Sequence, residues 1–402
     1  MSRQPVHKPP VVIVTLTLDV GGTEQHIATV APLLVERGWP VSVYCLNRAG
    51  EQAELLRSRG VDVIAPPREA AGRQTPRAKR AVLSTLAAAD LFRKYRRQKP
   101  AIAHTFLTEP FLFAGPAGIL ARVPIRVMSR RELKATRTNW PGARAVERRL
   151  IARMAAVLGN SRSVVAELIE DGAPRDRIGL IYNGIDVRRF SAGVDRERLR
   201  RDLGIAGDGR IAIMVANLFP YKGQRELIEG FASVAASLPE PWTLVLVGRD
   251  EGDRAHLEAR IAALGVGDRV RLVGQRKDVP SLLAASDIGI HASRQEGFSN
   301  AVLEQMATGL PVIVTEAGGN TDAVTHDKTG LIVPIEAPEA LAAAISTLAR
   351  DPARRTRLGA AARARIEKEF TLARVVDAYE ALYMGLLAGR RPAEIEGVGI
   401  GR

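Results

Sequence analysis

The stretch "DIGIHASRQEGFSNAVLEQMATGLPVIVTE" (residues 287–316) contains a complete strand–loop–helix–strand unit. Residues 287–293 and 311–316 are short apolar runs typical of buried strands, and the segment between them carries apolar residues at helical spacing. Gly309 and Pro311 mark the end of that helix. Two buried strands joined by a helix predict a parallel sheet covered by helices on both faces.

The same alternation extends along most of the chain. Amphipathic segments such as 24–38 and 223–238 separate short apolar runs, which fall into two series. The runs expected to be strands are 11–18, 41–46, 61–65, 101–106, 124–129, 155–161 and 178–184, then 210–217, 242–248, 269–274, 287–293, 311–316 and 330–334. The pattern predicts an α/β fold with two Rossmann-like, doubly wound parallel-sheet domains.

The domain boundaries follow from the point at which the second series of predicted strands begins. The first domain is expected to span residues 1–186 and the second 187–370, with the seam in "NGIDVRRFSAGVD" (183–195). A length of 402 residues suits two or three domains at roughly 100–200 residues each. The last segment, 389–402, is rich in Gly and Arg, and we expect a disordered tail there.

Composition narrows the class of protein. Cys45 is the single cysteine, so an internal disulfide is impossible and a reducing compartment is favoured. The longest apolar run, 111–121, is too short to span a membrane and contains Pro116.

The charge is unevenly distributed. The net charge is +14, and residues 1–189 hold 31 Lys and Arg against 16 Asp and Glu, whereas residues 190–402 hold 27 against 28. Basic stretches occur at 90–99 and 143–157. This favours an anionic partner for the first domain, such as a membrane surface or an anionic acceptor, although a merely solvated basic face is the alternative. An aromatic content of 4% argues against nucleic acid.

Two carboxylates, Glu296 and Glu304, flank the start of the helix in the opening stretch. The start of a helix presents unpaired N–H groups and a positive dipole end, which suit a phosphate. Glu304 lies about one turn into the helix, where it could hydrogen-bond a ribose diol, and Glu296 lies in the preceding loop. A solvated Glu304 and a dipole-favoured Glu296 are the alternatives. The amides concerned belong to Phe298, Ser299, Asn300 and Ala301.

The segment "EGFSNAVLEQMATGLPVIVTEAGG" closely resembles the EX7E signature of family 4 (group 1) retaining glycosyltransferases. The resemblance extends to "GGTEQHIATVAPLLVERGWPVSV", "IYNGIDVRRF", "VANLFPYKG" and "DVPSLLAASDIGIHASRQEGFSN", and so covers essentially the whole chain. It implies a GT-B fold, with two domains facing an interdomain cleft and a final helix, 371–388, that crosses back to the first domain.

The resemblance also implies roles for residues of the second domain. Glu296 would contact the donor sugar, Glu304 the nucleotide ribose, and Lys222 of "PYKG" the donor diphosphate. Many relatives carry a second phosphate-binding Arg five residues before this Lys, but here that position is Asn217. Arg294 or Arg276 could compensate, and Arg276 is also expected near the base.

In the first domain, three places at the ends of strands are candidates for ligand contact; the first two follow from the resemblance, and the third follows from the position of Arg130 in "VMSRRELK" (127–134). The loop of Gly21, Gly22 and Thr23 would face the diphosphate and the acceptor, with a simple tight turn as the alternative. His104 would contact the donor sugar, with a hydrogen-bonded core histidine as the alternative. Arg130 would reach an anionic acceptor or the diphosphate, with solvation as the alternative.

The function implied is transfer of a hexose, with retention of configuration, from a nucleoside-diphosphate sugar to an acceptor hydroxyl. A UDP- or GDP-sugar is favoured over an ADP-sugar, and neither a metal nor another cofactor is expected. The acceptor would be a lipid-linked or surface-polysaccharide glycan, and the protein would be cytoplasmic, peripheral on the inner face of the membrane. A nucleotide-sugar-binding subunit without turnover, or a nucleotide-sugar epimerase or hydrolase, are the alternatives. A Rossmann dehydrogenase is disfavoured because "DVGGTE" lacks the G-x-G-x-x-G pattern.

Overall fold

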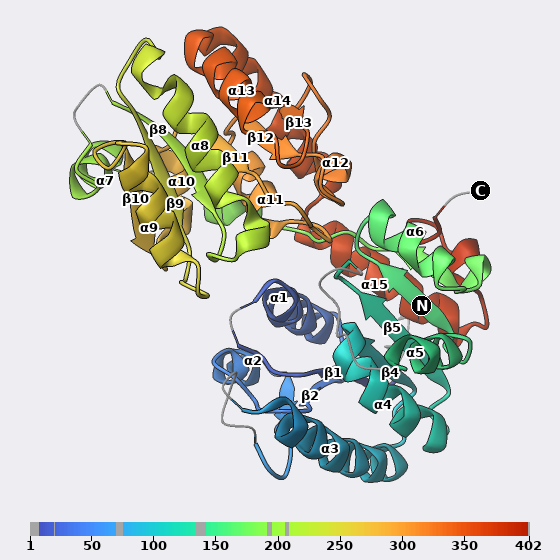
Figure 1. Cartoon of the computed structure of the whole chain (residues 1–402). Coiled ribbons are helices and arrows are strands. Elements are labelled where there is room, and N and C mark those ends of the chain that lie inside the picture. Colours follow the sequence, from blue (N-terminus) through green and yellow to red (C-terminus); the bar gives the residue numbers. More distant parts are fainter. Residues whose placement is uncertain are drawn as a thin grey trace. The chain divides into compact units, whose positions relative to one another are not determined.

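The computed structural model describes residues 8–19, 21–69, 75–133, 142–190, 195–205 and 209–400. The chain divides into two compact units (Figure 1). Residues 1–183 together with 373–402 form the first, and residues 184–372 form the second. Part of the expected linker, 191–194, lies outside the described residues.

The first unit is built on a seven-stranded parallel sheet of order β3-β2-β1-β4-β5-β6-β7. Each apolar run predicted for this half coincides with one of its strands, and only β5 extends one residue beyond its run. The strands are β1 Val11–Thr15, β2 Val41–Cys45, β3 Asp62–Ile64, β4 Ile102–Phe106, β5 Ile125–Arg130, β6 Ala156–Gly159 and β7 Ile178–Leu180.

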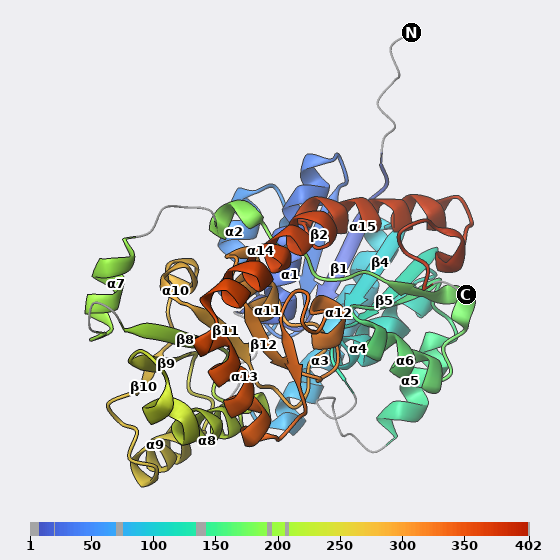
Figure 2. The same cartoon turned by 90° about the horizontal axis from the view of Figure 1, so that it is seen from above.

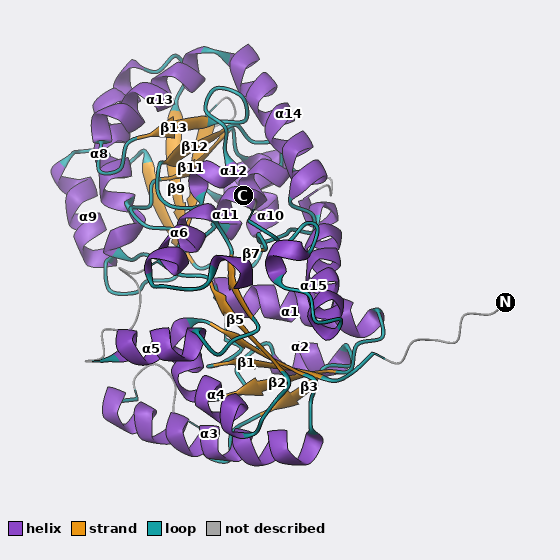
Figure 3. Ribbon diagram, turned by 90° about the vertical axis from the view of Figure 1, so that its right-hand side faces the viewer, coloured by secondary structure: helices purple, strands orange, loops and turns teal. Residues whose placement is uncertain are grey.

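Helices cover both faces of this sheet, as Figure 3 shows for several of them. On one face, alternate strand residues such as Val11 and Val43 pack against α1, α2 and α15. On the other, residues such as Val12 and Tyr44 pack against α3 and α4, and α5 and α6 continue that layer. The helices are α1 Gly22–Glu36, α2 Ala53–Ser58, α3 Arg77–Gln98, α4 Thr108–Leu120, α5 Ala143–Ile151, α6 Arg162–Glu170 and α15 Leu372–Leu387.

The C-terminal segment thus belongs to the first unit. Helix α15 contributes Val376, Tyr379 and Leu382 to its core, so the final helix does return to the first sheet as the fold family implies.

The prediction of a disordered tail is wrong for residues 389–400. Ile395 and Val398 are buried, and the Val398 carbonyl accepts a hydrogen bond from the Leu180 amide of β7 at 2.8 Å. A short 3-10 turn, η6 (Pro392–Glu394), precedes them. Two apolar side chains in a Gly- and Arg-rich segment are enough to anchor it; residues 401 and 402 lie outside the described chain.

The second unit has a six-stranded parallel sheet of order β10-β9-β8-β11-β12-β13. The chain winds outward from β8 to β10 and then returns to place β11 on the other side of β8. Loops after β8 and β11 therefore leave neighbouring strands at the switch point of the sheet, where ligands of such folds bind. The strands are β8 Arg210–Val215, β9 Trp242–Val247, β10 Val270–Gly274, β11 Ile288–His291, β12 Val312–Thr315 and β13 Leu331–Val333.

Helices again form two layers, visible in Figure 2. Helices α8, α9 and α13 pack over the strand face that carries Met214 and Leu246, whereas α10, α11 and α14 lie over the opposite face. The helices are α7 Arg196–Asp202, α8 Gln224–Val234, α9 Arg254–Ala263, α10 Val279–Ala285, α11 Asn300–Ala307, α12 Asn320–Ala323, α13 Pro338–Arg350 and α14 Pro352–Glu369. Among the described residues, no helix combines the length and the apolar character needed to cross a bilayer.

Candidate functional site

The carboxylate of Glu296, which is largely shielded from solvent, lies at the centre of the polar cluster at the carboxyl edge of the second sheet. Its Oε1 accepts hydrogen bonds from Lys222 Nζ at 2.5 Å and from His291 Nε2 at 2.6 Å. Glu296 and Lys222 have side chains only 11% and 18% exposed, and His291 is 2% exposed. An ionised carboxylate can only accept, so His291 Nε2 must carry the proton.

The topology brings these three residues together. Lys222 ends the short turn η4 (Pro220–Lys222) that follows β8, and His291 is the last residue of the adjacent strand β11. The next residue after Lys222, Gly223, has φ +76°, and a Cβ there would lie 2.0 Å from the Ala292 carbonyl oxygen. Glycine is therefore required for the two loops to approach this closely.

Electrostatics within the cluster favour the charged forms of both partners. Burial opposes ionisation of Glu296, but the ammonium of Lys222 and the ring of His291 outweigh it and hold the pKa of Glu296 far below its usual range. Burial also disfavours the Lys222 cation, yet Glu296 raises the pKa of Lys222 above its ordinary value. The cluster thus holds a fixed cation beside a fixed anion.

The second carboxyl of the opening stretch, Glu304, has a different environment. It is half-buried, about one turn into α11, and its carboxyl group makes no hydrogen bond or ion pair with the described part of the chain. Burial raises the pKa of Glu304 to about 7, although Arg189 of η3 (Val187–Phe190) opposes this shift. A half-buried carboxyl without a partner is a ready acceptor for hydroxyl groups of a ligand.

Helix α11 begins as the sequence predicts. Ser299 is the N-cap, and its Oγ accepts a hydrogen bond from the Val302 amide at 3.4 Å. Asn300 and Ala301 open the first turn. The Phe298 side chain, however, is buried against Phe370 with ring centroids 5.5 Å apart, so only its backbone can face a ligand.

The arginines proposed to replace the missing phosphate-binding cation are paired elsewhere. Arg294 forms ion pairs with Glu226 and with Glu336, the latter at 2.7 Å. Arg276 bonds Asp278 of its own loop at 2.7 and 2.8 Å. Both guanidinium groups thus have carboxylate partners in this structure, and their role in replacing the missing phosphate-binding Arg stays a prediction.

Asn217 takes a structural position instead of an ionic one. Its Oδ1 accepts a hydrogen bond from the Arg249 amide at 3.1 Å, and its carbonyl accepts one from Gln224 Nε2 at 3.0 Å. It therefore ties the end of β8 to the loop after β9 and to the first residue of α8.

In the first unit, Arg130 is completely buried. It bonds Glu147 at 2.5 Å and Asp171 at 2.8 Å, so the expectation that it reaches an acceptor or a diphosphate is wrong. Two carboxylates neutralise it inside the layer of α5 and α6, where removing one partner would leave an unpaired buried charge.

His104 is likewise a core residue, which corrects its assignment to the donor sugar. It has no exposed surface, and its Nδ1 and Nε2 are each 2.7 Å from a hydroxyl, of Tyr383 and Ser129 respectively. Burial, helped by the nearby cation of Arg131, lowers the pKa of His104 to about 3. The neutral ring has both nitrogens satisfied and neither available to a ligand.

The glycine loop of the first unit is present at the expected place. Gly21 is the N-cap of α1 in an extended conformation, and Gly22 and Thr23 open the helix. A Cβ at Gly21 would lie 2.3 Å from a carboxylate oxygen of Glu24, so the side chain of Glu24 folds back over the helix start. This carboxylate makes the helix start less suited to an anion than the sequence alone indicates.

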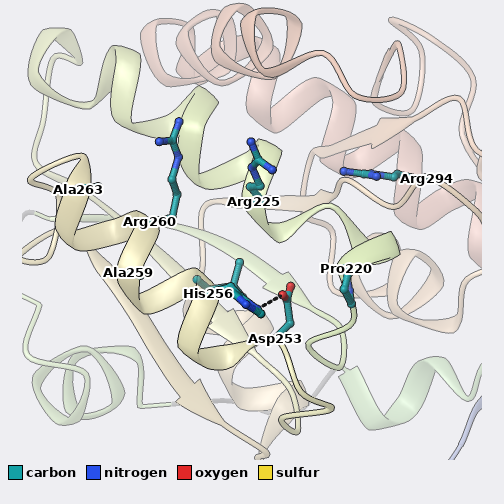
Figure 4. Close-up of a pocket in the computed structure, with 9 residues that line it drawn as sticks. Pro220, Arg225, Asp253, His256, Ala259, Arg260, Ala263 and Arg294 are labelled. Atoms are coloured by element: carbon teal, nitrogen blue, oxygen red, sulfur yellow. Dashed lines mark ion pairs between the residues drawn. The ribbon is translucent and has the colours of Figure 1, made fainter.

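A cavity of about 590 Å³ lies beside the cluster, between α8 and α9 (Figure 4). Its basic side chains are matched by acids: Arg260 bonds Glu229 at 2.8 Å, and Arg225 bonds the same carboxylate at 3.1 Å. Neither Glu296 nor Glu304 lines it. In the described ranges, no group of three or more His, Cys, Asp and Glu residues is arranged to hold a metal ion.

The sequence analysis missed two residues of the site. His291 was given no role, yet its ring bonds Glu296; the signal was a histidine at the carboxyl end of the strand that leads into the glutamate loop. Arg189 was quoted within "NGIDVRRF" without a role, yet it is the cation that influences Glu304. The position of Arg189 near Glu304 of α11 depends on tertiary structure, and no local sequence pattern indicates it.

Comparison with known proteins identifies the family of this chain. Residues 20–189 match the profile of Glycosyltransferase Family 4, and residues 195–365 match that of Glycosyl transferases group 1. The chain belongs to the group 1, family 4 glycosyltransferases.

Individual relatives of this glycosyltransferase support the same family. It is 28% identical over 372 residues to the D-inositol 3-phosphate glycosyltransferase of Corynebacterium glutamicum (strain R), covering 85% of this chain and 87% of that protein. It is 27% identical over 274 residues to the lipopolysaccharide core biosynthesis mannosyltransferase LpsB of Rhizobium meliloti (strain 1021), covering 67% and 74%.

Solved structures establish the GT-B fold of this glycosyltransferase. The Anabaena protein Alr3699/HepE in complex with UDP superposes with a TM-score of 0.80 at 23% identity, over 94% of this chain and 100% of that one. WaaG, a glycosyltransferase involved in lipopolysaccharide biosynthesis, superposes with a TM-score of 0.71 at 19% identity, over 93% of this chain and 100% of that one. The prediction of two Rossmann-like parallel-sheet domains is confirmed.

Proposed function

We propose that this glycosyltransferase moves a hexosyl group from a nucleoside-diphosphate sugar to an acceptor hydroxyl, with retention of anomeric configuration. One observation carries the proposal: at the switch point of the second sheet, Glu296 is held by Lys222 and His291 while Glu304, one turn into α11, has an unpartnered carboxyl. This arrangement suits a donor whose sugar hydrogen-bonds Glu296 and whose ribose hydrogen-bonds Glu304.

Each residue then has a physical task. Lys222 supplies positive charge where the departing diphosphate gains negative charge. Glu304 accepts from the ribose diol, the N-terminal amides of α11 receive the phosphate, and Glu296 accepts from hydroxyls of the donor sugar. Glu296 is ionised and largely shielded from solvent, so it is a rigid acceptor and need not act as a nucleophile.

Retention is proposed to follow from attack on the face that the diphosphate leaves, with a phosphate oxygen taking the proton of the acceptor hydroxyl. The protein contributes positioning and preorganised charge, which suffice for large rate effects. Lys222 and the helix start take the part of a metal ion, so activity should survive EDTA. Loss of activity on chelation, restored by added metal, would contradict this part of the proposal.

The donor is proposed to be a UDP- or GDP-sugar. HepE has been solved with UDP and with UDP-glucose, which favours uridine. A thermal-shift panel with UDP, GDP, ADP and their sugars tests this directly, because a ligand that binds the folded state alone raises its stability. Stabilisation by one nucleotide class names the donor, and no stabilisation by any of them contradicts the proposed site.

The acceptor is proposed to be a lipid-linked or surface-polysaccharide glycan. LpsB acts in lipopolysaccharide core biosynthesis and the Corynebacterium protein is named for an inositol phosphate acceptor, so anionic acceptors are represented among relatives. The excess of basic residues in 1–189 suits such an acceptor and suits a cytoplasmic enzyme peripheral on the inner face of the membrane. Incubation of the donor with membrane extracts should label a lipid-soluble product, and release of free sugar alone would favour a hydrolase.

A further inference from the structure

Helix α3 (Arg77–Gln98) presents one continuous solvent face with an unusual composition. Its exposed residues recur every three or four positions, which places them on a single side of the helix. The middle of that side is apolar, since Val82 is 61% exposed and Leu86 is 47% exposed. Its basic members are Lys79, Arg93, Arg96 and Arg97, none of which has an ion-pair partner within the described chain.

The neighbouring helices continue this surface. α3 contacts α4, α4 contacts α5, and all three pack on the same face of the first sheet (Figure 3). Leu120 at the end of α4 is 70% exposed, and Val146 on α5 is 45% exposed. Arg148 and Arg149 of α5 are also exposed, and neither forms an ion pair with any described residue. Four of the seven large apolar side chains exposed in the described chain thus lie on this one layer.

The three helices α3, α4 and α5 expose no carboxylate, whereas α6, which continues the layer, exposes Glu170. The three helices contain one acid each, and every one is turned inward or paired. Asp90 accepts a hydrogen bond from the Tyr44 hydroxyl at 2.9 Å, Glu109 lies 4.0 Å from Arg80, and Glu147 is buried on Arg130. A surface with exposed cations, exposed aliphatic groups and no exposed anion is complementary to an anionic lipid surface, into which the aliphatic groups can insert.

Nucleic acid fits this face less well. Binding of single strands uses aromatic side chains as stacking platforms, and all the large apolar residues exposed in the described chain are aliphatic. We propose that the outer face of α3, α4 and α5 is the surface by which this protein docks on a bilayer containing anionic lipid. This deepens the proposed membrane location and rests on it.

The test uses the full-length protein and sedimentation with vesicles. Phosphatidylcholine vesicles containing about 25% phosphatidylglycerol should retain the protein, whereas pure phosphatidylcholine should not, because each basic residue near an anionic surface contributes about five-fold in affinity. Binding should weaken strongly in about 1 M salt, where charges are screened within roughly 3 Å. Equal binding to both vesicle types would overturn the proposal.

Two variants with the same charge locate the surface. Arg93→Gln, Arg96→Gln and Arg97→Gln together should lower vesicle affinity on the order of a hundred-fold. The control variant removes the same charge from exposed, unpaired positions of the second unit, by Arg198→Gln, Lys328→Gln and Lys368→Gln together. It should lower the vesicle affinity far less. Equal losses in the two variants, or a loss confined to the second, would overturn the assignment to this face.

A second pair of variants tests the exposed apolar side chains of this surface. Leu86→Gln should weaken vesicle binding several-fold, whereas Leu55→Gln, on α2 and 54% exposed, should not. Retention of the protein on double-stranded DNA but not on anionic vesicles would replace lipid by nucleic acid and overturn the proposal. Nucleotide thermal shifts separate the two hypotheses: normal shifts without vesicle binding contradict the docking surface alone, and vesicle binding without shifts contradicts the donor site while supporting the docking surface.

Discussion

A single oxygen of Glu296 accepts hydrogen bonds from both Lys222 and His291. If Lys222 turns to the diphosphate when the donor binds, Glu296 loses one of its two partners. His291 can remain, because its ring is buried and fixed at the end of β11. We therefore expect His291 to be a positioning residue that keeps the carboxylate charged and oriented while the lysine changes partner.

This role predicts different outcomes for two substitutions of His291. His291→Leu removes a hydrogen bond to a charged group, worth about 1.5–3 kcal/mol, and should lower kcat/KM by about 10- to 100-fold. His291→Gln keeps a donor at a similar distance from the backbone and should stay within a few-fold of the wild type. The reason is that only the leucine variant leaves Glu296 without a second hydrogen-bond donor.

Ligand binding distinguishes positioning from a merely structural defect. His291→Leu should reduce the thermal shift given by the sugar nucleotide but leave the shift given by the nucleotide alone, since Glu296 is proposed to meet only the sugar. Equal loss of both shifts, or equal activity of the two variants, would contradict the role.

The elevated pKa of Glu304 predicts that removing its charge stabilises the folded protein but weakens binding of the donor nucleotide. Its folded-state pKa is about 7 against an ordinary 4.5, so the folded protein favours the protonated acid. Below pH 4.5 the carboxyl is protonated in both the folded and the unfolded protein, so its burial does not lower the free energy of unfolding. As the pH rises through 7, the free energy of unfolding falls by up to about 3 kcal/mol. Glu304→Gln should therefore be more stable than the wild type by about 1–3 kcal/mol near pH 8, with most of this gain gone near pH 5.

Urea unfolding at the two pH values measures this effect, and nucleotide thermal shifts measure its functional counterpart. The variant should lose most of its stabilisation by the donor nucleotide, because the ribose loses a charged acceptor. A variant no more stable than the wild type at high pH would show that Glu304 is not penalised by burial.

At the scale of elements, the C-terminal segment shows how few side chains are needed to fix a chain end. Ile395 is 4% exposed and lies in the core beneath α15, where Gly385 leaves room for it. Ile395→Ala should destabilise the first unit by about 2–4 kcal/mol, as expected for a large aliphatic residue removed from a packed site.

Met384 provides the control on the same helix. It is 40% exposed, so Met384→Ala should change stability by less than about 0.5 kcal/mol. Urea denaturation followed by circular dichroism compares the two variants, and equal midpoints would mean that the tail is not packed in solution.

The sequence predicted the thirteen strands because each is a short apolar run, and burial on both faces of a parallel sheet requires such runs. It also placed Lys222 and Glu296 in the connections after two neighbouring strands and Glu304 in the helix that follows, as the structure has them, while their roles stay predictions. It failed for His104 and Arg130, because a position at the end of a strand does not reveal which face the side chain occupies. The partner of His104, Tyr383, lies 279 residues away on α15, which no local pattern can reveal.

At the scale of the whole molecule, the residues proposed to grip the sugar and the ribose of the donor all belong to one unit. Lys222, Glu296 and Glu304, with His291 and Arg189 beside them, all belong to residues 184–372. That unit has a hydrophobic core of its own, formed by both its sheet and its helices. We therefore expect residues 184–372, produced alone, to fold cooperatively and to bind the donor nucleotide within a few-fold of the full-length affinity.

The same fragment should not transfer sugar to the acceptor, since it lacks the first unit, whose excess of basic residues is proposed to suit the acceptor. Calorimetric titration with the nucleotide measures binding, and Lys222→Met in the fragment is the matched control, expected to weaken binding about 10-fold or more through loss of a charge-assisted contact. A fragment that folds, as judged by circular dichroism and a cooperative melt, yet fails to bind the nucleotide would mean that the first unit supplies part of the donor site. Binding equal to that of the intact chain would confine donor recognition to the second sheet and leave the first unit to the acceptor and the membrane.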